Sequence, residues 1–188
     1  ALIPAIEAGF VESVHSFGAE LGMERYIRAR PDVFFTGNDG GMRSNRAYSQ
    51  MAGHYACDLF IGSTLQIDLD GNSSTATSGR IAGFGGAPNM GADARGRRHA
   101  TEAWLKAGRE AGETNGMPRG RKLVVQMVET FREHMTPTFV ERLDAWDLAE
   151  RAGFALPPVM IYGDDLTHIV TEEGIANLLL CRGREERE

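Results

Sequence analysis

The chain has little lysine, little cysteine and no long apolar run, and each shortage excludes a class of protein. Lys106 and Lys122 are the only lysines among 20 basic residues, which face 26 acidic ones and leave a formal net charge of -6. Because phosphate backbones attract basic surfaces, this balance argues against nucleic acid as a partner. Cys57 and Cys181 stand far apart and form no C-x-x-C pair. We therefore expect free thiols in a reducing compartment.

No apolar run approaches the roughly 18 residues of a membrane span, and no basic-then-apolar signal segment is present. We therefore expect a cytoplasmic protein without a membrane partner. The chain of 188 residues is 42% hydrophobic and 24% charged, which predicts one globular domain over residues 1–188. Because it starts without methionine and ends in a charged run, we expect it to be a piece of a longer polypeptide.

Several catalytic motifs are also missing. The chain contains neither a G-x-x-x-x-G-K-[ST] phosphate loop nor a G-x-S-x-G nucleophile motif. Its five histidines are scattered and have no partner at ligand spacing, so we predict no metal site. A G-x-G-x-x-G dinucleotide loop begins at Gly83 and Gly85, but Pro88 replaces the last glycine, which close helix–strand packing requires. A P-loop enzyme is excluded, and a dinucleotide site is disfavoured.

Stretches typical of strands alternate with stretches typical of helices, which predicts an α/β fold with an open sheet and flanking helices. We expect a central strand over 56–69 that enters a turn at 70–72, and a returning strand or a loop over 73–80. The glycine and proline density of 108–121 predicts a mobile loop. Further strands are expected at 11–17, 32–36, 122–128 and 168–171, and helices at 2–8, 19–30, 44–55, within 89–106, at 147–152 and at 173–181.

The glycine-rich stretch 81–91 follows the expected central strand and precedes an arginine cluster. Glycines let a ligand approach the backbone closely. Backbone N–H groups at a helix start, together with Arg95, Arg97 and Arg98, could hold a phosphate group. The alternative is a tight surface connection followed by a solvated basic turn. The residues alone leave both interpretations open.

Glu172 follows an apolar strand at a point where ligands gather in α/β sheets. Neighbouring residues of a strand face opposite ways, so at most one of Glu172 and Glu173 reaches a common pocket. The alternative is that both begin a helix, whose dipole favours acidic residues in its first turn.

Three segments taken together resemble the coenzyme A transferase superfamily. Residues 61–72 (IGSTLQIDLDGN) resemble its strand and turn S-A-L-x-[VI]-D-x-x-G-[QN]. Residues 83–90 (GFGGAPNM) are similar to its acyl-CoA loop G-x-G-G-x-x-D-[FM], from which Pro88 and Asn89 depart. Residues 169–177 (IVTEEGIAN) resemble its V-V-T-E-x-G-[IV]-A segment. Within the superfamily, residues 30–37, 84–91 and 159–165 are most similar to the malonate decarboxylase alpha-subunit family.

The resemblance implies a coenzyme-A-transferase-like open sheet with flanking helices, in the C-terminal portion of a longer subunit. It implies an acyl-carrier transferase that exchanges malonate for acetate. The exchange takes place on the thiol of a phosphoribosyl-dephospho-CoA arm, which an acyl carrier protein supplies. The implied partners are that carrier and the other malonate decarboxylase subunits, and no metal is implied. The glutamate motifs S-E-N-G and H-x-E are absent here. Direct attack of the incoming carboxylate on the thioester is therefore the implied route.

Site residues follow from the resemblance. The N–H groups of Gly85 and Gly86 would stabilise the charge that develops on the thioester oxygen. Glu172 is the third catalytic candidate. Substrate or arm binding is expected from a second set, which comprises Asn72, Gly83, Phe84, Asn89, Arg95, Arg97 and Arg98. Two alternatives stay open: an acetyl-CoA hydrolase or carboxylate CoA-transferase that uses free CoA, and a non-catalytic carrier-docking or assembly domain.

Overall fold

The computed structural model describes residues 2–15, 21–35, 59–82, 102–103, 106, 123–183 and 185–187. The chain divides into two compact units, residues 1–50 and residues 51–188. The predicted mixed α/β fold with open sheets and flanking helices is confirmed. No helix in the described ranges is long and apolar enough to cross a membrane.

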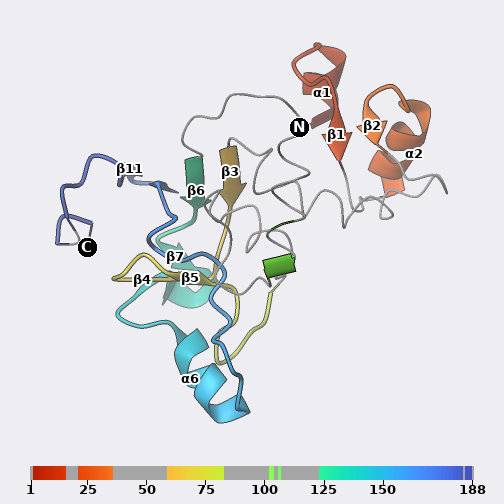
Figure 1. The fold of residues 1–188 in the computed structure, drawn as a ribbon. Helices are drawn as coiled ribbons and strands as arrows, with labels where there is room; N and C mark the ends of the chain where they lie inside the picture. Colours follow the sequence, from red (N-terminus) through yellow and green to blue (C-terminus); the bar gives the residue numbers. More distant parts are fainter. Residues whose placement is uncertain are drawn as a thin grey trace. The chain divides into compact units, whose positions relative to one another are not determined.

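The described part of the first unit contains two short helices and a two-stranded parallel sheet (Figure 1). Its buried core is formed by Ile6, Ile27, Val33 and Phe34. Both helices expected here are confirmed, and the second ends just before Pro31, which disfavours a helical residue ahead of it. The two expected strands are shorter than predicted. The elements are α1 (Leu2–Glu7), β1 (Val14–His15), α2 (Leu21–Ala29) and β2 (Phe34–Phe35).

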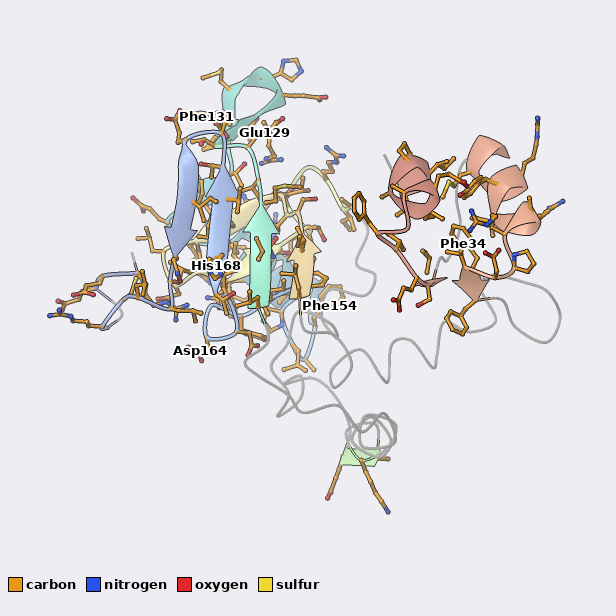
Figure 2. All side chains as sticks on the ribbon, turned by 90° about the horizontal axis from the view of Figure 1, so that it is seen from above. Phe34, Glu129, Phe131, Phe154, Asp164 and His168 are labelled. Atoms are coloured by element: carbon orange, nitrogen blue, oxygen red, sulfur yellow. The ribbon has the colours of Figure 1, made fainter. Side chains whose placement is uncertain are left out.

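The second unit contains a four-stranded sheet in the order β11–β10–β6–β3. Strands β3, β6 and β10 run parallel, and β11 is antiparallel to β10. In Figure 2 the arrowheads of β6 and β10 point toward the end at which Glu129 and Phe131 are labelled, while Asp164 lies at the opposite end. The strands are β3 (Leu59–Gly62), β6 (Leu123–Met127), β10 (His168–Thr171) and β11 (Gly174–Asn177).

A second, three-stranded sheet has the order β5–β4–β9. Its backbone joins the apolar segment 159–162, because Ser73 donates its N–H to the carbonyl of Ile161 at 2.8 Å. Helix α6 covers a core of Leu143 and Val159, and it ends at Gly153 as the sequence predicts. The remaining elements are β4 (Gln66–Asp68), β5 (Ser73–Ser74), β7 (Phe131–Arg132), η1 (Glu133–Met135), β8 (Thr136–Pro137), β9 (Phe139–Val140) and α6 (Asp144–Ala152).

The single central strand expected over 56–69 is wrong. Within the described residues, this region forms two strands in two different sheets, and β3 lies at the end of its sheet rather than in the middle. The chain changes sheets at Thr64, whose buried hydroxyl donates to the carbonyl of Ser74 at 2.8 Å. This bond replaces ladder hydrogen bonds at the break. The turn at 70–72 is confirmed, and the segment that follows it forms a returning strand only at β5, which is two residues long.

The final helix expected over 173–181 is also wrong, because residues 174–177 form β11. Thr171 pairs with Gly174, so the two glutamates between them form the turn of a hairpin. Gly174 has φ of 151°, a conformation that L side chains rarely adopt and that a helix does not contain. The apolar residues after it fit a helical period equally well, and pairing with β10 decides between the two structures.

Several expectations lie outside the described residues. They are the helix at 44–55, nearly all of the helix within 89–106, the glycine-rich stretch from 83 onward and the loop at 108–121.

Candidate functional site

A cleft of about 590 Å³ lies between the two sheets of the second unit, with β4 and β9 on one side and β10 and β11 on the other. The exposed apolar side chains Leu69, Phe139 and Ile175 line it, and the acidic residues Asp70 and Glu173 stand among them. A cleft of this size with a largely apolar lining is typical of small-molecule sites. It is our candidate site in the described part of the chain.

Glu172 lies at the carboxyl end of β10, in the hairpin turn. Its carboxylate oxygens accept the backbone N–H of Thr130, at 3.1 and 3.0 Å from the nitrogen. Hydrogen bonds from its own backbone N–H and from Thr130 lower the pKa of the Glu172 carboxyl group. The group is therefore ionised at neutral pH, where it accepts hydrogen bonds and cannot act as a proton donor.

Only one glutamate of the adjacent pair lines the cleft. That residue is Glu173, whereas Glu172 is absent from the lining and is turned toward Thr130. The alternative in which both begin a helix is wrong, because they form a hairpin turn. In this turn Glu173 donates its N–H to the hydroxyl of Thr171 at 3.1 Å.

Asn72 follows the turn between β4 and β5, and its side chain is engaged within the protein. Its Nδ2 donates to Asp68 Oδ2 at 3.2 Å, and its Oδ1 accepts the backbone N–H of Gly163 at 3.1 Å. Its backbone N–H also bonds Asp68, at 2.9 Å. These contacts make Asn72 a brace for the turn, and its binding role stays a prediction.

A second cleft of about 590 Å³ adjoins the first and shares with it Leu69, Asp70, Leu178 and Arg187. Asn72 lies in its lining, so the amide stands beside a cavity even though its polar atoms are engaged.

Sequence reasoning missed three residues that shape the candidate site. Thr130 binds Glu172 across 42 positions of sequence, and no local pattern signals this contact. Arg187 donates to the carbonyls of Gly163 and Leu166 at 3.0 and 2.7 Å. A Cβ on Gly163 would lie 1.8 Å from the carbonyl oxygen of Asp70. Gly163, Asp164 and Asp165 directly follow the apolar run 159–162, and this pattern could have indicated the turn.

The other predicted site residues lie outside the described residues, and their roles stay predictions. They are Gly83, Phe84, Gly85, Gly86, Asn89, Arg95, Arg97 and Arg98. Among the residues that the structure does describe, no group of three or more histidine, cysteine, aspartate or glutamate side chains could hold a metal ion.

Comparison with known proteins places this geometry in a family. Residues 1–188 match the family described as "Malonate decarboxylase, alpha subunit, transporter". The chain belongs to this malonate decarboxylase alpha-subunit family. A curated member from Malonomonas rubra, "Acetyl-S-ACP:malonate ACP transferase", is 70% identical over 190 residues, which cover 99% of this chain and 34% of that protein.

Two solved structures of malonate decarboxylases are similar along the same length. A Pseudomonas malonate decarboxylase hetero-tetramer in complex with malonate matches with a TM-score of 0.76 and 67% identity, covering 99% of this chain and 34% of that chain. A malonate decarboxylase alpha subunit from Acinetobacter baumannii matches with a TM-score of 0.77 and 64% identity, covering 99% and 35%. The chain therefore spans about a third of the length of these relatives.

Proposed function

We propose that this chain is part of an acyl-carrier-protein transferase that exchanges malonate for acetate on the thioester of a carrier protein. The observation that carries the proposal is the 70% identity, across 99% of the chain, to an acetyl-S-ACP:malonate ACP transferase. The partners proposed with it are an acyl carrier protein and the other subunits of a malonate decarboxylase, since one relative is a hetero-tetramer in complex with malonate. The cytoplasmic location expected from the cysteine content belongs to the same proposal.

The thiol-bearing arm of the carrier, which we take to be phosphoribosyl-dephospho-CoA, brings the acyl group as a thioester. The lining of the described cleft fits an extended, largely uncharged chain, because Leu69, Phe139 and Ile175 expose apolar surface there. Malonate is a poor occupant of this cleft. It carries two negative charges, and the described lining holds three carboxylates, those of Asp68, Asp70 and Glu173, against one cation, Arg187. The Arg187 guanidinium already donates to two backbone carbonyls.

Charge stabilisation at the reacting carbonyl is assigned to Gly85 and Gly86, with phosphate binding by Arg95, Arg97 and Arg98. Preorganised N–H donors are effective at a developing oxyanion because they need no reorganisation during the reaction. Attack by the malonate carboxylate releases the thiol, which then takes the malonyl group and frees acetate. These two acyl-transfer steps need no oxidant and no further reactant.

The test uses the full-length subunit with acetyl-loaded carrier protein and radiolabelled malonate. Label that appears on the carrier supports the proposal, whereas label that appears only as malonyl-CoA, in a parallel reaction with acetyl-CoA in place of the loaded carrier, supports a CoA-transferase. No transfer to either acceptor, with carrier binding retained, leaves the docking domain as the better interpretation. A G86V variant that transfers at the wild-type rate would refute the oxyanion assignment alone.

A further inference from the structure

The turn of the β10–β11 hairpin is tied to the opposite sheet by a short chain of hydrogen bonds. Glu172 accepts the N–H of Thr130 at 3.0 and 3.1 Å. The carbonyl of Thr130 accepts the N–H of Thr138 at 3.0 Å, and the carbonyl of Thr138 accepts the N–H of Ile67 at 2.8 Å. Thr138 and Ile67 are almost completely buried, so water does not compete for the last link.

This chain of bonds runs beside the candidate cleft. Ile67 of β4 lines the cleft from one side, and Thr171 and Glu173 line it from the hairpin side. Thr130, in the connection that follows β6, also lines the cleft. Glu172 is the side chain that connects the two sides at the turn, although its own carboxylate stays out of the lining. Two residues before the contact between Thr130 and Glu172, the N–H of Val128 donates to the carbonyl of Val170 at 2.9 Å.

We propose that Glu172 is a positioning residue, whose carboxylate clamps the hairpin turn to Thr130 and thereby fixes the two walls of the cleft. The proposal rests on the transferase function, in which the cleft receives the carrier's arm. It replaces a direct catalytic role for Glu172 with an indirect one.

Two observations favour a clamp over a nucleophile. Both oxygens of the Glu172 carboxylate face the same N–H donor, which holds them away from the cleft. The same hydrogen bonds lower its pKa, and a carboxylate with a lowered pKa is a weaker base and a weaker nucleophile.

The test compares E172A and E172Q with E129Q in the full-length subunit. Glu129, labelled in Figure 2, is an exposed glutamate that directly precedes Thr130 in the connection after β6, and it makes a matched control. Hydrogen–deuterium exchange of the peptide that contains Thr130 reports the clamp directly. Steady-state transfer kinetics report how the clamp affects the KM for the acetyl carrier and the kcat.

We expect E172A to accelerate exchange at Thr130 by roughly tenfold, the factor for one charge-assisted hydrogen bond. The KM for acetyl carrier should rise by a similar factor, while kcat changes less. E172Q keeps an amide oxygen that can accept the Thr130 N–H, so it should restore most of the protection and most of the KM. E129Q should match the wild type in both measurements.

Unchanged exchange at Thr130 in E172A would refute the clamp. A kcat lowered equally in E172A and E172Q, with KM unaltered, would instead make Glu172 catalytic. If the wild-type subunit transfers no malonate, the proposed function fails, while the exchange measurement still decides the clamp.

Discussion

Replacing Asn72 by alanine removes the brace that joins the β4–β5 turn to Gly163. The amide makes two hydrogen bonds that alanine cannot make, one to the Asp68 carboxylate at 3.2 Å and one from the Gly163 N–H at 3.1 Å. The bond from the backbone N–H of residue 72 to Asp68 Oδ1 survives, because it does not use the Asn72 side chain. The variant therefore tests the side chain and leaves the turn's own backbone bond in place.

The loss of stability in N72A can be estimated from the two groups that lose a hydrogen-bond partner, the Gly163 N–H and the Asp68 carboxylate. Gly163 is buried, and a buried donor without an acceptor costs about 1–3 kcal/mol. Asp68 is only 8% exposed, and it loses one of its hydrogen-bond donors. A hydrogen bond to a charged group contributes roughly 1.5–3 kcal/mol, reduced here because another donor to Asp68 remains. Together we expect about 2–4 kcal/mol of local stability to be lost.

Hydrogen–deuterium exchange in the full-length subunit measures this loss where it occurs. A loss of about 2–4 kcal/mol accelerates exchange by roughly thirty-fold to several hundred-fold in the peptides covering residues 68–75 and 160–167. N177A is the control, because the Asn177 side chain makes a single exposed bond to the N–H of Leu179. Its effect should stay below about 1 kcal/mol.

An intermediate variant separates the two bonds. N72D keeps an acceptor for Gly163 but removes the donor to Asp68 and places a second carboxylate beside it, so exchange should accelerate mainly in the peptide covering residues 68–75. Protection in N72A within a few-fold of the wild type would show that the amide does not hold the turn, and the reasoning would then be wrong.

Three further changes test other contacts. G163A should not give soluble folded protein, because its Cβ would lie 1.8 Å from the Asp70 carbonyl oxygen, whereas G79A, with open space around it, should be purified in normal yield and show a wild-type circular dichroism spectrum. T138V should leave the denaturation midpoint unchanged or raise stability by up to about 1 kcal/mol, since the buried Thr138 hydroxyl has no hydrogen-bond partner among the described residues; a clear loss would reveal a partner. The lowered pKa of Glu172 means that its carboxylate stabilises the fold above the ordinary value of 4.5 and loses this effect as the pH falls through the folded-state value. The difference in unfolding midpoint between wild type and E172Q should therefore be constant near neutral pH and shrink in acid, and a difference that grows in acid would contradict it.

Local signals in the sequence predicted much of the second unit correctly. The apolar runs around Val124 and Ile169 form strands β6 and β10, and helix α6 ends at Gly153 as expected. Such features depend on residues close together in the chain, which is why the pattern sufficed. The family resemblance was likewise carried by short segments, and it is confirmed along the whole chain.

The prediction of secondary structure failed where pairing with a distant segment decides which structure a stretch of residues adopts. Residues 174–177 have a pattern that permits a helix, and they form a strand because β10 offers a free row of backbone groups beside them. The stretch 56–69 is predicted from its local pattern to be one strand. Its two halves join different sheets, since β3 pairs with β6 and β4 pairs with β9.

The same division applies to the candidate site. The sequence by itself determined the family and placed Glu172 at the carboxyl end of a parallel strand, because both follow from adjacent residues and their order. Only the tertiary structure decided that the carboxylate binds Thr130, that Asn72 braces Gly163 and that Glu173 is the glutamate facing the cleft. These contacts join residues 42 and 91 positions apart, and hydrogen bonds at such separations form only once the sheets have brought the two segments together.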